Sequence, residues 1–187
     1  MGISAGKLTK QALEECYHIR EDDAVGRAWS KKNKYLGYTS YASAADLQRR
    51  SSTFERLTAL FDKEVARYVK VLEFELEGRR LELCALWINI VAPNGYHGLH
   101  LHPHAVISGT YYLDTPKDSG RLKLEDPRLA SFMAAPGKKS GAKYPPFIYV
   151  NPKAGDLILF ESYLRHEVEQ NRSDEDRVSV SFNYAWV

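Results

Sequence analysis

The spacing of the hydrophobic residues changes near residue 80, and this change separates a helical part of the chain from a β part. Before that point apolar side chains recur at steps of three and four, which is typical of amphipathic helices. This spacing predicts one helix over about residues 7–20 and a longer one over about residues 54–72, which Ser52-Thr53-Phe54-Glu55 opens as a capping box. We expect the longer helix to pack one face against a sheet. Residues 23–50 give no clear prediction.

From Leu81 onward the hydrophobic period is two, which is typical of strands. It predicts strands over about residues 81–91, 99–102, 105–113, 121–125, 147–150, 156–161 and 178–184. The fold class is therefore mainly β with N-terminal helices, as a sandwich or a barrel, and periodicity alone does not choose between the two. Residues 127–146 predict a long loop, either a lid over a substrate or a surface excursion.

The composition is that of one globular domain, in which a helical part of about residues 1–80 packs on a β core of about residues 81–187. A net charge of +2 without a basic stripe gives no argument for a nucleic-acid partner. The sequence has no apolar run of the ~20 residues that a membrane span needs, and its start is too polar for a signal peptide. Cys16 and Cys84 are isolated from each other, which favours a reducing, cytoplasmic location.

Four of the six histidines lie within residues 97–104. Strand residues two apart share one face, so His100 and His102 can direct two imidazoles at one metal ion. His97 is out of phase and His104 follows Pro103, so we interpret both as ordinary polar residues or as partners behind the ligands.

A further ligand must come from elsewhere, and the best donor is His166, which follows an apolar strand and a bend. A histidine by itself is more often a hydrogen-bonded or surface residue than a ligand, so the prediction for His166 depends on the pair. Arg177 and Ser179, eleven and thirteen residues beyond it, share a strand face. They could clamp the carboxylate of a dicarboxylate cosubstrate, or Arg177 could be an ordinary cation at a strand edge.

Several motifs together resemble a family, the 2-oxoglutarate-Fe(II) oxygenases, and more closely a little-characterised bacterial and phage branch of it. The resemblance covers about residues 85–187, while the N-terminal half matches no family that we can name. The motifs are Trp87-x-Asn89, His100-x-His102-Pro103, Ser108-Gly109-x-Tyr111-Tyr112, Glu125-Asp126-Pro127-Arg128 and Ser179-x-Ser181-Phe182-Asn183, with Gly155-Asp156, His166 and Arg177-x-Ser179.

The resemblance implies a double-stranded β-helix, a jelly-roll barrel like that of the cupins, with Fe(II) at one mouth. It implies that His100 and His166 are iron ligands and that Arg177 and Ser179 bind the far carboxylate of 2-oxoglutarate. The implied reaction is a dioxygenase-type oxidation, with O2, of a small molecule or a protein side chain. The expected pocket residues are Trp87, Asn89, Tyr111, Tyr112 and Asn183, for which core packing is the alternative role.

The sequence departs from the family pattern at His102, because the usual set of ligands is two histidines and one carboxylate. We favour a site of three histidines. The alternatives are a carboxylate from Glu125 or Asp126, or a site that has lost its chemistry.

Two other functions stay open at this point. One is a cupin-like metalloenzyme with three histidines and no 2-oxoglutarate, and the other is a non-catalytic jelly-roll module that binds a metal or ligand. The oligomeric state is also open, with a homodimer among the options.

Overall fold

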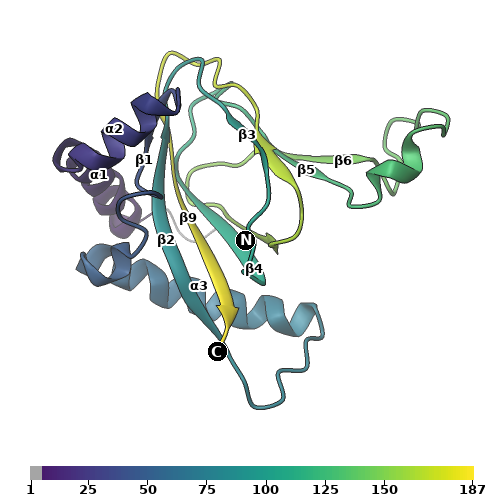
Figure 1. The fold of residues 1–187 in the computed structure, drawn as a ribbon, viewed down its shortest axis with the longest axis horizontal. Coiled ribbons are helices and arrows are strands. Elements are labelled where there is room, and N and C mark those ends of the chain that lie inside the picture. Colours follow the sequence, from purple (N-terminus) through teal and green to yellow (C-terminus); the bar gives the residue numbers. More distant parts are fainter. Residues whose placement is uncertain (1–5) are drawn as a thin grey trace.

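The computed structural model of the protein describes residues 6–187 and contains two antiparallel sheets with helices against one of them (Figure 1). The larger sheet has the order β1(Gly37–Thr39), β2(Leu81–Val91), β9(Arg177–Trp186), β4(Ile107–Asp114), β7(Leu157–Glu161). The smaller sheet has the order β3(His97–His100), β8(His166–Val168), β5(Leu122–Glu125), β6(Phe147–Val150). The predicted fold class, a double-stranded β-helix with N-terminal helices, is confirmed. The division into one domain stays a prediction.

The outer face of the larger sheet packs on the helices α1(Lys7–Asp22) and α3(Ser52–Val71). Phe61 of α3 stacks on Phe182 of β9 with the ring centroids 4.4 Å apart. The hydroxyl of Tyr111 on β4 lies 2.7 Å from that of Thr9 on α1. The expected packing of the long helix on a sheet is therefore confirmed.

The start of α3 differs in detail from the prediction. Ser51 is the N-cap, because its hydroxyl accepts hydrogen bonds from the backbone N–H groups of Thr53 and Phe54. Ser52 is already inside the helix, so the predicted capping box with Glu55 is wrong by one residue.

Residues 23–50, which the hydrophobic pattern did not resolve, form α2(Ala24–Lys32), β1 and a short 3-10 helix, η1(Leu47–Arg49). Strand β1 extends the larger sheet, since Gly37 pairs with Val91 of β2. Gly37 has φ of +124°, and a Cβ there would lie 2.0 Å from the carbonyl oxygen of Ile90. Only glycine fits this approach, which fixes the course of the chain between α2 and β1.

Strands β5 and β6 project from the body as a hairpin, and residues 126–146 join them at its tip (Figure 1). Most of this predicted loop is irregular, with one 3-10 helix, η2(Leu129–Phe132). Within residues 6–187, no helix combines the length and apolar character that a bilayer crossing requires.

Candidate metal centre

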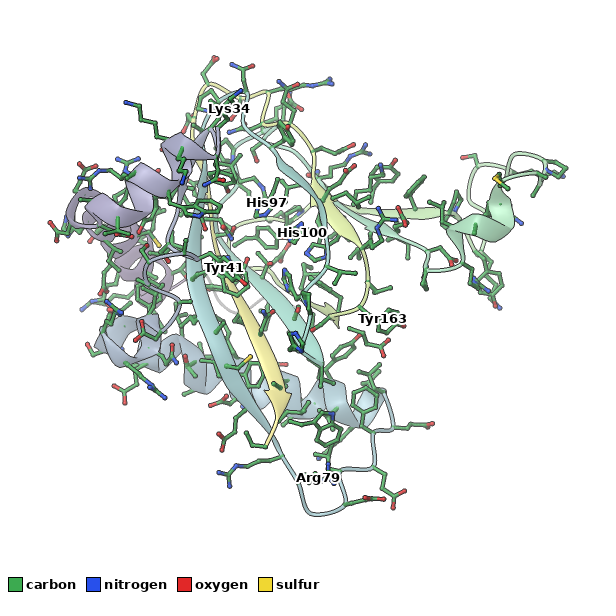
Figure 2. The ribbon with its side chains drawn as sticks, in the orientation of Figure 1. Lys34, Tyr41, Arg79, His97, His100 and Tyr163 are labelled. Atoms are coloured by element: carbon green, nitrogen blue, oxygen red, sulfur yellow. The ribbon has the colours of Figure 1, made fainter. Side chains whose placement is uncertain are left out.

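Three imidazoles meet between the two sheets. His100 is the last residue of β3, and it pairs with His166, the first residue of β8. His102 lies two residues beyond the end of β3, where its backbone N–H donates to the carbonyl of Ser162. The ring of His100 lies with its centroid 4.2 Å from that of His166 and 5.2 Å from that of His102. Figure 2 shows His100 and its strand neighbour His97 in the space between the sheets.

The ligand nitrogens of His100, His102 and His166 all lie within 4.8 Å of one another. Two nitrogens bound to one ion at about 2.1 Å are at most about 4.2 Å apart. For three ligands on one side of an ion the separation is about 3.0–3.4 Å, so the three imidazoles lie close enough to share one ion after a modest inward movement of the side chains. The structure brings together the three histidines that the sequence predicted as ligands, although His102 reaches the cluster from the irregular segment after β3 and not from the strand.

Each imidazole is oriented by a hydrogen bond at Nδ1. The Nδ1 atom lies 2.7 Å from the carbonyl oxygen of Gly98 in His100, 2.9 Å from that of Leu164 in His166, and 2.7 Å from the Oγ atom of Ser108 in His102. A carbonyl oxygen can only accept, so Nδ1 carries the proton in His100 and His166. Their Nε2 lone pairs are then free for a metal ion, as is usual in histidine metal sites.

The protonation states also suit a metal ion. Burial, with His100 nearby, lowers the pKa of His166 to about 3 and that of His102 to about 4. Burial lowers the pKa of His100 as well. All three rings are thus neutral near pH 7, which is the form in which histidine binds metals.

The side chain of Ser108 connects His102 to the larger sheet. Its Oγ atom donates to Oδ1 of Asn183 over 2.8 Å and lies 2.7 Å from the hydroxyl of Ser162. Because its one proton goes to Asn183, the Ser108 oxygen accepts from Nδ1 of His102. His102 is therefore held by a polar network from β4, β9 and the turn after β7.

Arg177 is 1% exposed and lines the same cavity as the three histidines. Its guanidinium carbon lies 4.9 Å from the ring centroid of Tyr112. The Nε and Nη2 atoms of Arg177 are buried without a hydrogen-bond partner among the described residues. Unpaired buried N–H groups on a cation are unfavourable, and hydrogen bonds to an anion would satisfy them.

Alternation along the strands explains which side chains line the cavity. Arg177 and Ser179 come from one face of β9, as predicted, and Ser181 follows on the same face. The other strands contribute alternate residues in the same way: Trp87, Asn89 and Val91 from β2, Thr110 and Tyr112 from β4, Leu122 from β5, and Val168 from β8.

Two of the expected pocket residues lie elsewhere. The prediction for Tyr111 is wrong, because successive strand residues face opposite sides and the ring of Tyr111 packs against Phe61 on the helical side. Asn183 faces the interior but belongs to the network behind His102 rather than to the cavity lining.

The carboxylates considered as iron ligands lie outside the histidine cluster. Glu125 is buried and pairs with Arg165 at 3.2 Å, and Asp126 pairs with Arg128 at 2.7 Å. Among the residues that the structure describes, the cluster that could hold a metal ion consists of the three histidines and includes neither of these carboxylates.

Two residues near the cavity were not among the predicted ligands and pocket residues. His97 lines it and stacks on His100 with the ring centroids 4.4 Å apart. In a regular strand, His97 and His100 would point to opposite faces. The pairing of β3 with β8 shifts register between these two residues, so the regular alternation does not hold here. Tyr35 contacts His97 edge-on, with the ring centroids 5.6 Å apart, and it comes from the segment that no pattern resolved.

Comparison with known families agrees with this geometry. Residues 85–183 match the sequence model of a family described as "Putative 2OG-Fe(II) oxygenase". No curated protein sequence matches the chain.

Several solved structures share the fold. A Pseudomonas putida prolyl-4-hydroxylase is 18% identical with a TM-score of 0.61, over 98% of this chain and 88% of that one. The epimerase SnoN of nogalamycin biosynthesis, in complex with Fe3+, alpha ketoglutarate and nogalamycin RO, is 17% identical with a TM-score of 0.64, over 98% and 77% of the two chains. The chain spans only 46% of a Burkholderia pseudomallei oxidoreductase of the 2OG-Fe(II) oxygenase family, at 20% identity over 58% of this chain and a TM-score of 0.44.

Proposed function

This chain belongs to the family of 2OG-Fe(II) oxygenases, and from that premise we propose that it is an enzyme that uses Fe(II), 2-oxoglutarate and O2 to oxidise a substrate. The Nε2 atoms of His100, His102 and His166 hold the iron. Arg177 and Ser179 bind the far carboxylate of 2-oxoglutarate. The substrate is a small molecule or a protein side chain, and the location is the cytoplasm.

The bound iron and 2-oxoglutarate supply the oxidation, in which 2-oxoglutarate, O2 and a substrate C–H group give succinate, CO2 and a hydroxylated product. The residues of the chain provide the arrangement. The three histidines would hold the ion, and Arg177 would orient the cosubstrate. The surrounding Trp87, Leu122 and Val168 exclude water.

The observation that carries this proposal is the position of Arg177. A buried guanidinium with two unpaired N–H groups shares one small cavity with three neutral imidazoles. A metal site without a cosubstrate would account for the three histidines but would leave the buried charge of Arg177 without a counter-ion. A dicarboxylate that reaches from the ion to Arg177 satisfies both ends, which favours 2-oxoglutarate over a cupin-like enzyme without this cosubstrate.

We propose three histidines as the complete set of protein ligands. The hydrogen bond from His102 to Ser108 orients this ring as a ligand, whereas Glu125 is already paired with Arg165. Three neutral ligands leave the iron more positive than the usual set with a carboxylate does. The variants Glu125→Gln and Asp126→Asn should keep one metal ion per chain by elemental analysis. Loss of the ion in either variant would show that the replaced carboxylate is a metal ligand.

The decisive experiment is the titration of the anaerobic, Fe(II)-loaded protein with 2-oxoglutarate, followed by calorimetry and visible absorption. We expect one binding event per chain, and on admission of O2 the formation of succinate that needs both iron and 2-oxoglutarate. Intact metal binding without 2-oxoglutarate binding would overturn the cosubstrate assignment.

The type of oxidation needs product analysis, because the same fold includes a protein named as a hydroxylase and another named as an epimerase. We propose hydroxylation. A product with an added oxygen atom, labelled from 18O2, supports it, and a product of unchanged mass would contradict it.

A further inference from the structure

A tyrosine from the N-terminal half lies beside the cavity with its hydroxyl unsatisfied. Tyr35 follows α2, two residues before β1, and so lies outside the residues 85–183 that match the family. Its OH group is buried and has no hydrogen-bond partner among the described residues. Within residues 6–187, four buried side-chain polar atoms lack a partner, and three of them belong to Tyr35 and Arg177.

The sheet brings these two residues to the same end of the barrel. Gly37 of β1 pairs with Val91 of β2, and Val91 pairs with Arg177 of β9. The backbone pairing continues one step further, because the N–H of Ala92 donates to the carbonyl of Leu36. Tyr35 therefore lies just beyond the end of the sheet at which Arg177 begins β9.

One contact and one electrostatic effect support the same placement. The ring of Tyr35 packs edge-on against His97, which lines the cavity together with Arg177. Burial raises the pKa of the Tyr35 hydroxyl, and the positive charge of Arg177 opposes this rise, so the two groups interact.

The unsatisfied atoms define the chemistry of a ligand. The phenol oxygen of Tyr35 and the guanidinium nitrogens Nε and Nη2 of Arg177 all donate hydrogen bonds, and a buried donor without a partner is unfavourable. A carboxylate has two oxygens with about four acceptor sites, so one carboxylate can accept from all three donors. No residue of the described chain supplies such an acceptor to either side chain's unpaired atoms.

We propose that Tyr35 donates a hydrogen bond to the far carboxylate of 2-oxoglutarate beside Arg177, so that the N-terminal segment completes the cosubstrate pocket. This inference rests on the proposed function. It adds to that function a binding residue that the matched part of the chain does not contain.

The test compares two ligands of the full-length chain loaded with Ni(II), which occupies the site without turnover. The first ligand is 2-oxoglutarate. The second is 2-oxovalerate, which keeps the 2-oxo acid that chelates the metal but ends in a methyl group in place of the far carboxylate. Calorimetry gives both dissociation constants for the wild type and for Tyr35→Phe, which removes only the hydroxyl and keeps the ring against His97.

We expect Tyr35→Phe to weaken 2-oxoglutarate binding about tenfold, as for the loss of one hydrogen bond to a charged group, and to change 2-oxovalerate binding by less than about twofold. The matched control is Tyr96→Phe, a tyrosine that is 63% exposed, which should change neither constant.

Each other outcome overturns a definite statement. If Tyr35→Phe binds 2-oxoglutarate as the wild type does, or weakens both ligands equally, Tyr35 does not bind the far carboxylate. If the Ni(II)-loaded wild type binds no 2-oxoglutarate, the proposed function fails, and this inference fails with it.

Discussion

The Nδ1 atom of His102 and the Oγ atom of Ser108 lie 2.7 Å apart, and this contact links the histidine cluster to the middle of the larger sheet. His102 has no strand of its own to hold it, since β3 ends at His100. Ser108, by contrast, is fully buried on β4, where it pairs with Phe160 of β7 and Asn183 of β9. The orientation of His102 therefore depends on a residue six positions later in the chain.

Replacing Ser108 by Ala should weaken metal binding. The change removes the acceptor for Nδ1–H of His102 and leaves the ring free to turn, and loss of such a partner typically costs 10–100-fold in metal affinity. Calorimetry with Ni(II) measures the effect directly. Ser162→Ala is the matched control, because it removes a neighbour of Ser108 and keeps the bond to His102. An equal loss in the two variants would show that the network acts only through packing.

Removal of a ligand should abolish stoichiometric metal. We expect His166→Ala and His102→Ala each to bind less than one ion per chain by elemental analysis after dialysis, because two imidazoles on an open site hold an ion weakly. His104→Asn provides the control from the same histidine-rich segment, since His104 is exposed and Asn tolerates its φ of +66°. Retention of a full equivalent of metal in His166→Ala would remove this residue from the site.

The sequence predicted the strands of the barrel best where hydrophobic alternation is long. The prediction of residues 81–91 agrees with β2, and the long helix and the last strand differ by only a few residues. The short strands β1 and β8 were missed, because three residues contain too little of a period to recognise. Their positions are set by pairing with β2 and with β3 and β5, which is information from distant parts of the chain.

The site shows the same limit. His100, His102 and His166 could be selected because spacing and residue type restrict metal ligands, and Arg177 and Ser179 because they share a strand face. The choice between Tyr111 and Tyr112 needed the knowledge of which face of β4 the helices cover. Tyr35 could not be predicted, since its segment has no hydrophobic periodicity and its only distinctive feature is a buried hydroxyl without a hydrogen-bond partner, which needs the structure to be seen.

Gly109 is a point where the sheet and the helix layer leave no room for a side chain. A Cβ at this position of β4 would lie 2.3 Å from Cζ of Phe182 and 2.8 Å from Cδ2 of Leu159. The ring of Phe182 cannot retreat, because Phe61 of α3 stacks on its other side. Gly109→Ala should therefore lower the free energy of unfolding by about 1–3 kcal/mol, measured by urea denaturation. Gly137→Ala is the control, because a Cβ there meets nothing within 4 Å. A change below about 0.5 kcal/mol in Gly109→Ala would show that the layers can separate at little cost.

In the absence of 2-oxoglutarate, Arg177 should lower the free energy of unfolding. It is a buried cation with unpaired N–H groups, so Arg177→Met keeps an unbranched apolar stem and removes the cost of the uncompensated charge. We expect the ligand-free variant to be as stable as the wild type or more stable by about 1 kcal/mol, and to retain its metal. Addition of 2-oxoglutarate at 100 times its dissociation constant should stabilise the metal-loaded wild type by about 2.7 kcal/mol and leave Arg177→Met unchanged. Urea denaturation of both proteins, with and without 2-oxoglutarate, gives the four values. If Arg177→Met instead lowers the free energy of unfolding by about 3 kcal/mol without 2-oxoglutarate, the contact of the guanidinium with Tyr112 stabilises the fold. In that case the burial of Arg177 is explained by structure and does not support a role in cosubstrate binding.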